Sequence, residues 1–312
     1  MRVFLAGATG AIGRPLVELL LRDGHEVIGM TRSPQRAGEL QAAGAQAVVA
    51  DALHRDATVA AVREARPDAI VHQLTAIPAL IDPRRIERDF VLTDRLRTEG
   101  TANLLAGARE AGVRRVIAQS IAFIYAQGPP GTVHVESDPL VDPEQVPRSF
   151  RRTAGAVAEL ERAVLGASGI VLRYGYFYGP GNSIARAGTM AQALRKRRVP
   201  IVGPGSGVWS FIHVWDAARA TVAALRREGP AVYNIVDEQP VPVAEWLPAF
   251  AQAVGAPRPL KIPTLLARPL AGPYGIQTMV HVQGADGALA RRELGWELRY
   301  PSWREGFRDG LG

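Results

Sequence analysis

The first half of the chain alternates short, continuously apolar runs with amphipathic segments of helical period. The apolar runs cover residues 3–6, 26–30, 45–50, 69–74, 115–120 and 170–174. They lack the strict polar–apolar alternation of a half-exposed strand, so they predict strands buried on both faces. Helical patterns lie between them at about 15–22, 34–43, 57–65, 84–111 and 153–165. Repeated strand–helix units predict an α/β fold with a doubly wound parallel sheet.

The pattern changes after Tyr174. Loop-forming residues dominate 175–207, a strand end and a helix follow over 210–227, and residues 232–236 predict one more strand returning to the sheet. The remaining helices are expected at about 185–197, 243–254 and 288–294. This division predicts a domain of residues 1–175 with a return segment at about 208–237, and a smaller C-terminal lobe of residues 176–207 and 238–312.

Composition and charge narrow the function classes. The chain has 312 residues, of which 47% are hydrophobic and 21% charged, so it can bury a sizeable core. It contains no cysteine, which excludes disulfides, a thiolate nucleophile and Cys-ligated metals and fits a reducing cytoplasm. Its net charge is +7, yet the only dense basic run is 195–198, so we expect no nucleic-acid partner.

Three further absences predict a soluble cytoplasmic protein without a metal. No stretch of about 18 apolar residues predicts a membrane span, and the apolar N-terminal run is too short for a signal peptide. The six histidines never fall at positions i and i+4, so we expect no metal site.

A glycine loop joins the first strand to the first helix with the spacing G-x-x-G-x-x-G. The first glycine permits a tight turn, the second lets the backbone approach a pyrophosphate, and the third lets helix and strand pack closely. The helix then offers free N–H groups and the positive end of its dipole to the phosphates. This context indicates a dinucleotide site. Its predicted residues are Gly7, Thr9, Gly10, Ala11, Ile12 and Gly13.

The end of the second strand indicates which dinucleotide binds. An NAD site places Asp or Glu about 20 residues beyond the loop, whereas this chain has Thr31, Arg32 and Ser33, with Arg36 close behind. Arg32 can pair with a 2′-phosphate through two hydrogen bonds, the two hydroxyls can donate, and Arg36 adds charge. We therefore predict NADP(H) as the cofactor. Asp51, after the third strand, either contacts the adenine amino group or caps a turn.

Further short motifs follow in order along the chain. They are Asp51-Ala52-Leu53, His72-Gln73-Leu74-Thr75, Gly100-Thr101-Ala102-Asn103-Leu104-Leu105, Tyr178-Gly179-Pro180-Gly181, Phe211-Ile212-His213-Val214-Trp215-Asp216-Ala217-Ala218, Tyr233-Asn234-Ile235 and Leu294-Gly295-Trp296. With the glycine loop, they make the chain resemble the extended short-chain dehydrogenase/reductase family, in its NAD(P)-dependent epimerase/dehydratase branch. The resemblance covers nearly the whole length.

The resemblance implies a Rossmann-like domain with the nicotinamide over the carboxyl ends of the strands, and a substrate pocket closed by the C-terminal lobe. It also implies that Gln73 and Thr75 line the path of the cofactor. We assign Ala52, Leu53, Leu74 and Ser120 to the cofactor site as well.

The proton relay that this resemblance implies is missing. The family usually needs a Tyr-x-x-x-Lys pair and a nearby Ser or Thr. The two lysines, Lys196 and Lys261, are preceded four residues earlier by glutamine and proline, so no such pair exists. Alignment on the helix places Arg151 and Gly155 at the tyrosine and lysine positions. Ile121 falls where the hydroxyl is expected.

Three functions stay open for such an atypical member. The first is an NADP(H)-dependent oxidoreductase acting on a small or medium organic carbonyl, imine or activated alkene. Its candidate catalytic residues are Tyr176 as the leading proton donor, Tyr125 as the second, and Arg151 as a fixed cation for a developing oxyanion. The second is a catalytically silent NADP(H)-binding sensor or scaffold. The third is an epimerase, lyase or cyclase that retains the nucleotide.

The expected partner is a small-molecule substrate. The family resemblance also implies a homodimer formed through the helical stretch 84–111, whose charged face equally predicts a helix in solvent.

Overall fold

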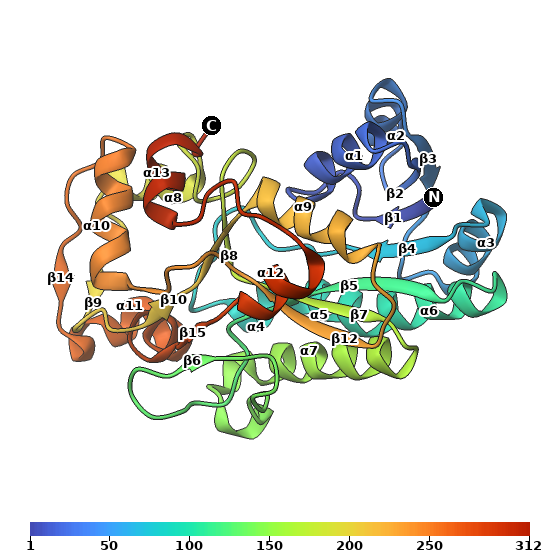
Figure 1. Cartoon of the computed structure of the whole chain (residues 1–312). Coiled ribbons are helices and arrows are strands. Elements are labelled where there is room, and N and C mark those ends of the chain that lie inside the picture. The colour runs from blue at the N-terminus through green and yellow to red at the C-terminus, as the bar shows by residue number, and fades with distance from the viewer.

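Seven parallel strands form the central sheet of the protein, which a computed structural model describes over residues 1–312 (Figure 1). From edge to edge the strands are β12 (Ala231–Ile235), β7 (Ile170–Tyr174), β5 (Arg115–Ile121), β4 (Ala69–His72), β1 (Arg2–Ala6), β2 (Glu26–Thr31) and β3 (Gln46–Val49). All neighbouring strands pair in parallel. The sheet confirms the predicted doubly wound α/β class, and the segment expected to return to it is β12.

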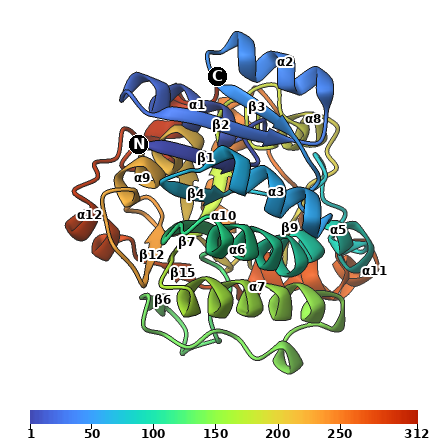
Figure 2. The same ribbon diagram turned by 90° about the vertical axis from the view of Figure 1, so that its right-hand side faces the viewer.

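Helices cover both faces of the sheet (Figure 2). One face carries α1 (Gly13–Arg22), α2 (Pro34–Ala42), α9 (Val214–Ala224) and α12 (Ala288–Leu294). The other carries α3 (Arg55–Ala65), α6 (Thr101–Glu110) and α7 (Arg148–Gly166). The sheet is therefore enclosed, which explains why its strands read as continuous apolar runs.

The first strand–helix unit shows how the pattern produces the packing. Val3, Phe4, Leu5 and Ala6 of β1 are fully buried, because helices cover both sides of the strand. In α1 the apolar stripe of Leu16, Val17 and Leu20 faces the sheet, while the charged positions between them face solvent. Pro15 is tolerated in the first helical turn, where a backbone N–H has no intrahelical acceptor.

The expected long helix over 84–111 is wrong as a single element. It divides into α4 (Ile86–Asp89), α5 (Val91–Arg95), a π-helical turn η1 (Leu96–Gly100) and α6. The break between α4 and α5 lies at Phe90, whose backbone angles of φ −100° and ψ 0° leave the helical region. Buried positions keep a spacing of three to four residues across both interruptions, so this spacing alone does not reveal them.

A smaller lobe extends from the carboxyl ends of the strands and lies at the left of Figure 1. Its helices are α8 (Thr189–Arg195), α10 (Val243–Ala253), α11 (Thr264–Ile276), the π-helical turn η3 (Gln277–His281) and α13 (Trp303–Asp309). It has a core of its own, dominated by aromatic side chains such as Trp246, Phe250, Trp303 and Phe307. The predicted boundaries between domain and lobe stay a prediction.

Four two-stranded pairings connect the lobe and the loops at this end of the molecule. They are β8 (Tyr176–Tyr178) with β11 (Phe211–His213), β9 (Ile201–Val202) with β14 (Lys261–Ile262), β10 (Val208–Trp209) with β13 (Val241–Pro242), and β6 (Val133–His134) with β15 (Gly284–Ala285). A short 3-10 turn, η2 (Pro143–Gln145), precedes α7. No helix of the structure is both long and apolar enough to cross a bilayer.

Candidate functional site

The glycine loop between β1 and α1 can be built only from glycine at two of its positions. Gly7 has a φ of 93°, and a Cβ there would lie 2.7 Å from the carbonyl oxygen of Gln73. A Cβ on Gly13 would lie 2.2 Å from the carbonyl oxygen of Gly7. A Cβ on Gly10 would lie 3.3 Å from its nearest neighbour, the carbonyl oxygen of Gly7. Gly10 therefore fits less tightly against the protein, and the side of the loop that faces away from the sheet stays open. The loop is thus packed tightly on the protein side and bare on the other.

The bare side of the loop carries unused hydrogen-bond donors. The backbone N–H groups of Ala11, Ile12 and Gly13 find no acceptor within the chain, because they precede the first closed turn of α1. They point outward at the positive end of the helix dipole, which is the arrangement that binds a phosphate. These residues therefore fit the diphosphate of a dinucleotide.

The residues predicted to select the 2′-phosphate lie together at the carboxyl end of β2. The hydroxyl oxygen of Thr31 accepts from the N–H of Ser33 at 3.2 Å, and the hydroxyl oxygen of Ser33 accepts from the N–H of Arg36 at 3.3 Å. Each hydroxyl hydrogen therefore remains available to donate. Arg32 and Arg36 are exposed and form no ion pair within the chain. Two free guanidinium groups thus stand beside two hydroxyls, and no carboxylate follows β2 directly.

The remaining predicted cofactor residues form the walls around this loop. Asp51 uses one carboxylate oxygen to accept from the N–H of Leu53 at 3.0 Å, so it closes a turn. Ala52 is buried, and its carbonyl accepts from the side chain of Asn103 at 2.8 Å.

Gln73 packs its backbone against Gly7 and is buried. Its side-chain nitrogen donates to the hydroxyl of Tyr174 at 3.0 Å, and its amide oxygen has no partner. Leu74 and Thr75 follow at the end of β4, where Thr75 is exposed. These residues line the end of β4 next to the glycine loop.

Tyr176 is the predicted catalytic residue with a free polar group. Its ring lies stacked between Phe123, at a centroid distance of 4.2 Å, and Trp209, at 3.6 Å. Its hydroxyl is buried and has no hydrogen-bond partner. Burial raises the pKa of Tyr176 well above its usual value, and the neighbouring Tyr274 raises it further. The hydroxyl is therefore a neutral donor held by rigid aromatic packing.

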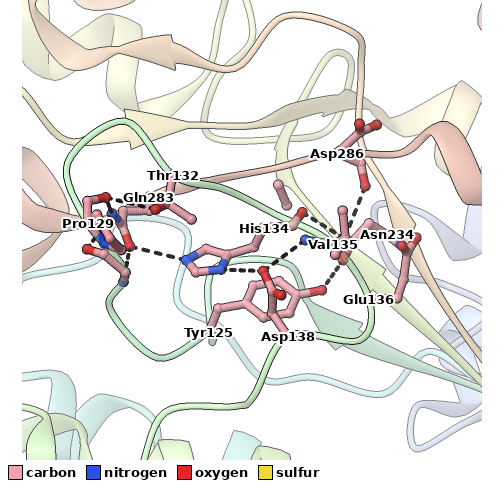
Figure 3. A network of polar contacts seen from close by, with 12 residues as sticks. Tyr125, Pro129, Thr132, His134, Val135, Glu136, Asp138, Asn234, Gln283 and Asp286 are labelled. Carbon is pink, nitrogen blue, oxygen red and sulfur yellow. Dashed lines mark hydrogen bonds and ion pairs between the residues drawn. The ribbon is translucent and has the colours of Figure 1, made fainter.

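Tyr125 has its hydroxyl fully engaged. It donates to the side-chain oxygen of Asn234 at 2.6 Å and accepts from Arg173 at 2.9 Å. Its ring stacks on His134, whose nitrogens contact Asp138 at 2.9 Å and Gln283 at 3.1 Å (Figure 3). This network connects β6 with the segment that leads into β15. The hydrogen bonds of Tyr125 therefore hold the fold together and leave its hydroxyl without a free position for a substrate.

Ser120 and Arg151 are likewise engaged elsewhere. Ser120 donates to Glu161 at 2.6 Å, inside a buried pair of Glu161 with Arg173, so its hydroxyl is not directed at the glycine loop. Arg151 pairs with Glu144 at 2.5 Å beside η2. A Cβ on Gly155, one turn further along α7, would meet nothing within 4 Å. Arg151 and Gly155 thus share the side of α7 that does not pack on the sheet.

The position at the end of β5 where the family resemblance implies a hydroxyl carries an apolar side chain. Ile121 packs against a buried cluster that includes Phe150 and Val157, and the partly buried Tyr274 packs against the same cluster.

Sequence reasoning missed Phe123, which stacks on Tyr176, Tyr274, which packs on the apolar cluster, and the buried Arg97. Arg97 is buried in η1, and its charge acts on the hydroxyl of Tyr274 in α11. The one available signal was an arginine on the buried face of a helical pattern. Tyr274 gave none, since it lies among prolines and glycines.

The hollows of the molecule do not mark the site by themselves. One of about 470 Å³ lies between α10 and α13 and contains none of the predicted site residues. A cavity of about 40 Å³ beside Phe123 and Tyr125 has room for about one water. The site is therefore defined by its free polar groups.

Comparison with known proteins agrees with this geometry. Residues 3–236 match the model of the NAD dependent epimerase/dehydratase family. The chain belongs to this family. It is 46% identical, over 100% of its length and 99% of the relative, to a 3-diazoavenalumate denitrifying reductase of a Streptomyces species.

A second relative is more distant. It is a 4-hydroxy-2-methyl-3-oxo-4-farnesyl-3,4-dihydroquinoline-1-oxide ketoreductase of Stigmatella aurantiaca. The two chains are 29% identical, over 96% of the chain described here and 92% of the relative. Among solved structures, UDP-glucose 4-epimerase of Thermus thermophilus in complex with NAD has a TM-score of 0.76 at 23% identity, covering 100% of this chain and 98% of that one. The structural likeness shows the fold alone.

Proposed function

We propose that the protein is an NADP(H)-dependent reductase of the atypical extended type, acting on a small or medium organic substrate. The observation that carries the proposal is the combination of a complete dinucleotide loop with a free, buried hydroxyl, that of Tyr176, just beyond the carboxyl end of β7. The names of both relatives describe reductases, which supports reduction over epimerisation.

The cofactor is held by the chain's own free donors. The N–H groups of Ala11, Ile12 and Gly13 bind the diphosphate. Arg32 and Arg36, with the hydroxyls of Thr31 and Ser33, bind the 2′-phosphate through charge-assisted hydrogen bonds. When bound, the nicotinamide supplies the hydride for reduction.

Tyr176 donates a hydrogen bond to the substrate atom that gains negative charge. Because burial raises its pKa, the hydroxyl stays protonated and is a weak acid. Full proton transfer from it is costly, so the site suits an acceptor that is already electrophilic: an imine, an activated alkene or an activated carbonyl. The rings of Phe123 and Trp209, stacked on the two faces of Tyr176, exclude water and strengthen this hydrogen bond.

Two measurements test the proposal. Titration calorimetry with NADPH and NADH is expected to show binding, with NADPH the tighter ligand. NADPH oxidation, followed at its absorbance maximum, is expected with at least one member of a panel of imines, enones, quinones and diazo compounds.

The alternative function, a silent NADP(H)-binding sensor, makes the opposite prediction for the second measurement. Tight NADPH binding with no oxidation across the panel would support the sensor. Absence of heat with either nucleotide would overturn both functions.

A further inference from the structure

The outer edge of the lobe, residues 186–202 and 258–270, carries the four most exposed large apolar side chains of the chain. Leu265, Leu266 and Leu270 of α11 expose 71%, 64% and 63% of their surface, and Leu260 exposes 57%. Positions i, i+1 and i+5 lie on one side of a helix, and the buried Ala267 lies on the other. A contiguous apolar face in water is unfavourable, so this face marks a contact surface.

The same edge concentrates the positive charge of the molecule. The sequence has no aspartate or glutamate between Glu161 and Asp216, or between Glu245 and Asp286. Its net charge is +7, and the outer edge alone carries eight cations, so the rest of the chain is close to neutral. None of the eight forms an ion pair within the chain. They are Arg186, Arg195, Lys196, Arg197, Arg198, Arg258, Lys261 and Arg268.

The cations and the leucines share one surface because the two segments are joined. β9 follows Arg198 closely and pairs in parallel with β14, and the N–H of Ile201 donates to the carbonyl of Leu260 at 2.8 Å. Further back, Nη2 of Arg195 donates to the carbonyl of Val254 at 2.9 Å, which fastens the end of α8 to the chain that leads into β14. Figure 1 shows β9, β14 and α11 together at the outer end of the lobe.

Charge and apolar surface together limit what can cover this edge. A nucleic acid would pair with the cations but leave the leucines without an apolar partner. A second copy of the same face would bring its own eight cations against these. An acidic protein would need a groove shaped to separate protruding leucines, whereas a fluid bilayer accommodates them without one.

A bilayer with anionic head groups offers both kinds of contact at once. Its phosphates are suited to guanidinium and ammonium groups, and its alkyl chains, just beneath, are suited to leucines. Arginine and lysine side chains are long enough to keep their charges among the phosphates while shorter apolar neighbours lie deeper.

We propose that the outer edge of the lobe docks the protein onto a membrane surface that contains anionic phospholipids. The exposed leucines of α11 enter the boundary beneath the head groups, and the eight cations bind the phosphates. Docking of this kind needs no helix that crosses the bilayer. It is independent of the proposed reductase function, because none of the predicted cofactor or catalytic residues belongs to this edge.

Vesicle binding by the full chain tests the proposal. The probes are phosphatidylcholine vesicles with and without about one third phosphatidylglycerol, and sedimentation measures the partition coefficient. We expect partition into the anionic vesicles to be at least about tenfold stronger, because each cation near such a surface contributes to binding. High salt is expected to weaken it by screening the charges.

Two double variants separate the leucines from the charges. Leu265→Ser with Leu266→Ser removes apolar surface, and Lys196→Gln with Arg198→Gln removes two cations. Each is expected to lower the partition into anionic vesicles by about tenfold or more. All four side chains are exposed, so the melting temperature and the Kd for NADPH are expected to stay unchanged.

The controls remove the same kinds of group from the other end of the molecule. Val49→Ser takes an exposed apolar side chain from β3. Arg63→Gln with Arg109→Gln takes two exposed cations from α3 and α6, which lie far from the lobe in Figure 1. Both controls are expected to keep the partition of the wild-type chain within about twofold.

Two results would overturn the proposal. Absent or equal binding of the wild-type chain to the two kinds of vesicle would leave an acidic protein as the occupant of this edge. Strong binding that survives loss of both leucines would describe unspecific adsorption of a cationic protein. The first result needs no variant. The Kd for NADPH is measured separately, so failure of this inference is distinguishable from failure of the reductase function.

Discussion

At the scale of single residues, the site is distinguished by which polar groups are free. Tyr125, Ser120 and Arg151 are predicted site residues whose polar atoms are engaged within the chain. Tyr176 has a free hydroxyl and Arg32 a free guanidinium. Sequence reasoning identified all five, but only the folded chain separates them, because hydrogen-bond partners such as Asn234 and Glu161 are distant in sequence.

Removal of one oxygen tests the role of Tyr176. Tyr176→Phe keeps the aromatic stack and removes the donor, so kcat of NADPH oxidation is expected to fall by about 10²-fold with little change in the melting temperature. Tyr125→Phe is the matched control. It leaves the polar partners of Tyr125 buried and unsatisfied, so we expect about 1–3 kcal/mol lower stability in urea unfolding. Full activity of Tyr176→Phe would remove the donor assignment.

Cofactor choice is tested at Arg32. Arg32→Leu removes a charge-assisted contact to the 2′-phosphate, so the Kd for NADPH is expected to rise by roughly tenfold or more while that for NADH stays constant. Calorimetry measures both. Arg22→Leu, at the far end of α1, removes an exposed arginine paired with Glu18 and is expected to change neither Kd. A parallel loss for both nucleotides would contradict the assignment.

At the scale of elements, apolar period predicts strands and helices well and interruptions poorly. The seven strands of the sheet were predictable because each is a continuous apolar run between turns. The π-helical turn η1 was not, because the positions buried through it keep the spacing of an ordinary helix. Helix α11 was missed because Pro269, Gly272 and Pro273 lie inside it. Helix α13 was missed as well.

Substitution of Gly13 tests the geometry of the glycine loop, and Gly155 in α7 provides the control. Gly13→Ala places a methyl group 2.2 Å from the carbonyl of Gly7, so the loop must shift. We expect loss of nucleotide binding and about 1–3 kcal/mol of destabilisation. Gly155→Ala in α7 meets open space and is expected to stabilise the protein by about 0.5–1 kcal/mol. Urea unfolding and calorimetry check both, and unchanged NADPH affinity in Gly13→Ala would contradict the geometry of the loop.

At the scale of the whole molecule, two buried histidines, His72 and His213, each join segments that are distant in sequence through hydrogen bonds from both ring nitrogens. Nδ1 of His72 accepts from the N–H of Leu74, and its Nε2 contacts the hydroxyl of Thr101. Nδ1 of His213 accepts from the N–H of Trp215, and its Nε2 donates to the carbonyl of Gly310. Protonation would turn each Nδ1 acceptor into a donor facing an N–H. Burial accordingly lowers both pKa values to about 4.

These lowered pKa values predict acid sensitivity. The neutral forms of His72 and His213 stabilise the folded state fully above pH 6.5, the usual pKa of histidine. This stabilisation is lost as the pH falls from 6.5 toward about 4, because the unfolded chain then binds protons that the folded chain does not. At about 1.4 kcal/mol per pKa unit, each histidine accounts for about 3 kcal/mol. Urea unfolding at pH 7, 6, 5 and 4.5 measures this loss. His213→Asn keeps an oxygen to cap α9 and is expected to flatten the profile; an unaltered profile would refute the role of His213.

The position of β12 has a consequence for synthesis on the ribosome. β7 ends at Tyr174, and its outer hydrogen-bonding edge is covered only by β12, which begins at Ala231. At about 5–20 residues per second, the nascent chain exposes a bare, apolar edge for several seconds. Translation speed between these two strands should therefore govern how much of the protein is recovered folded and how much aggregates.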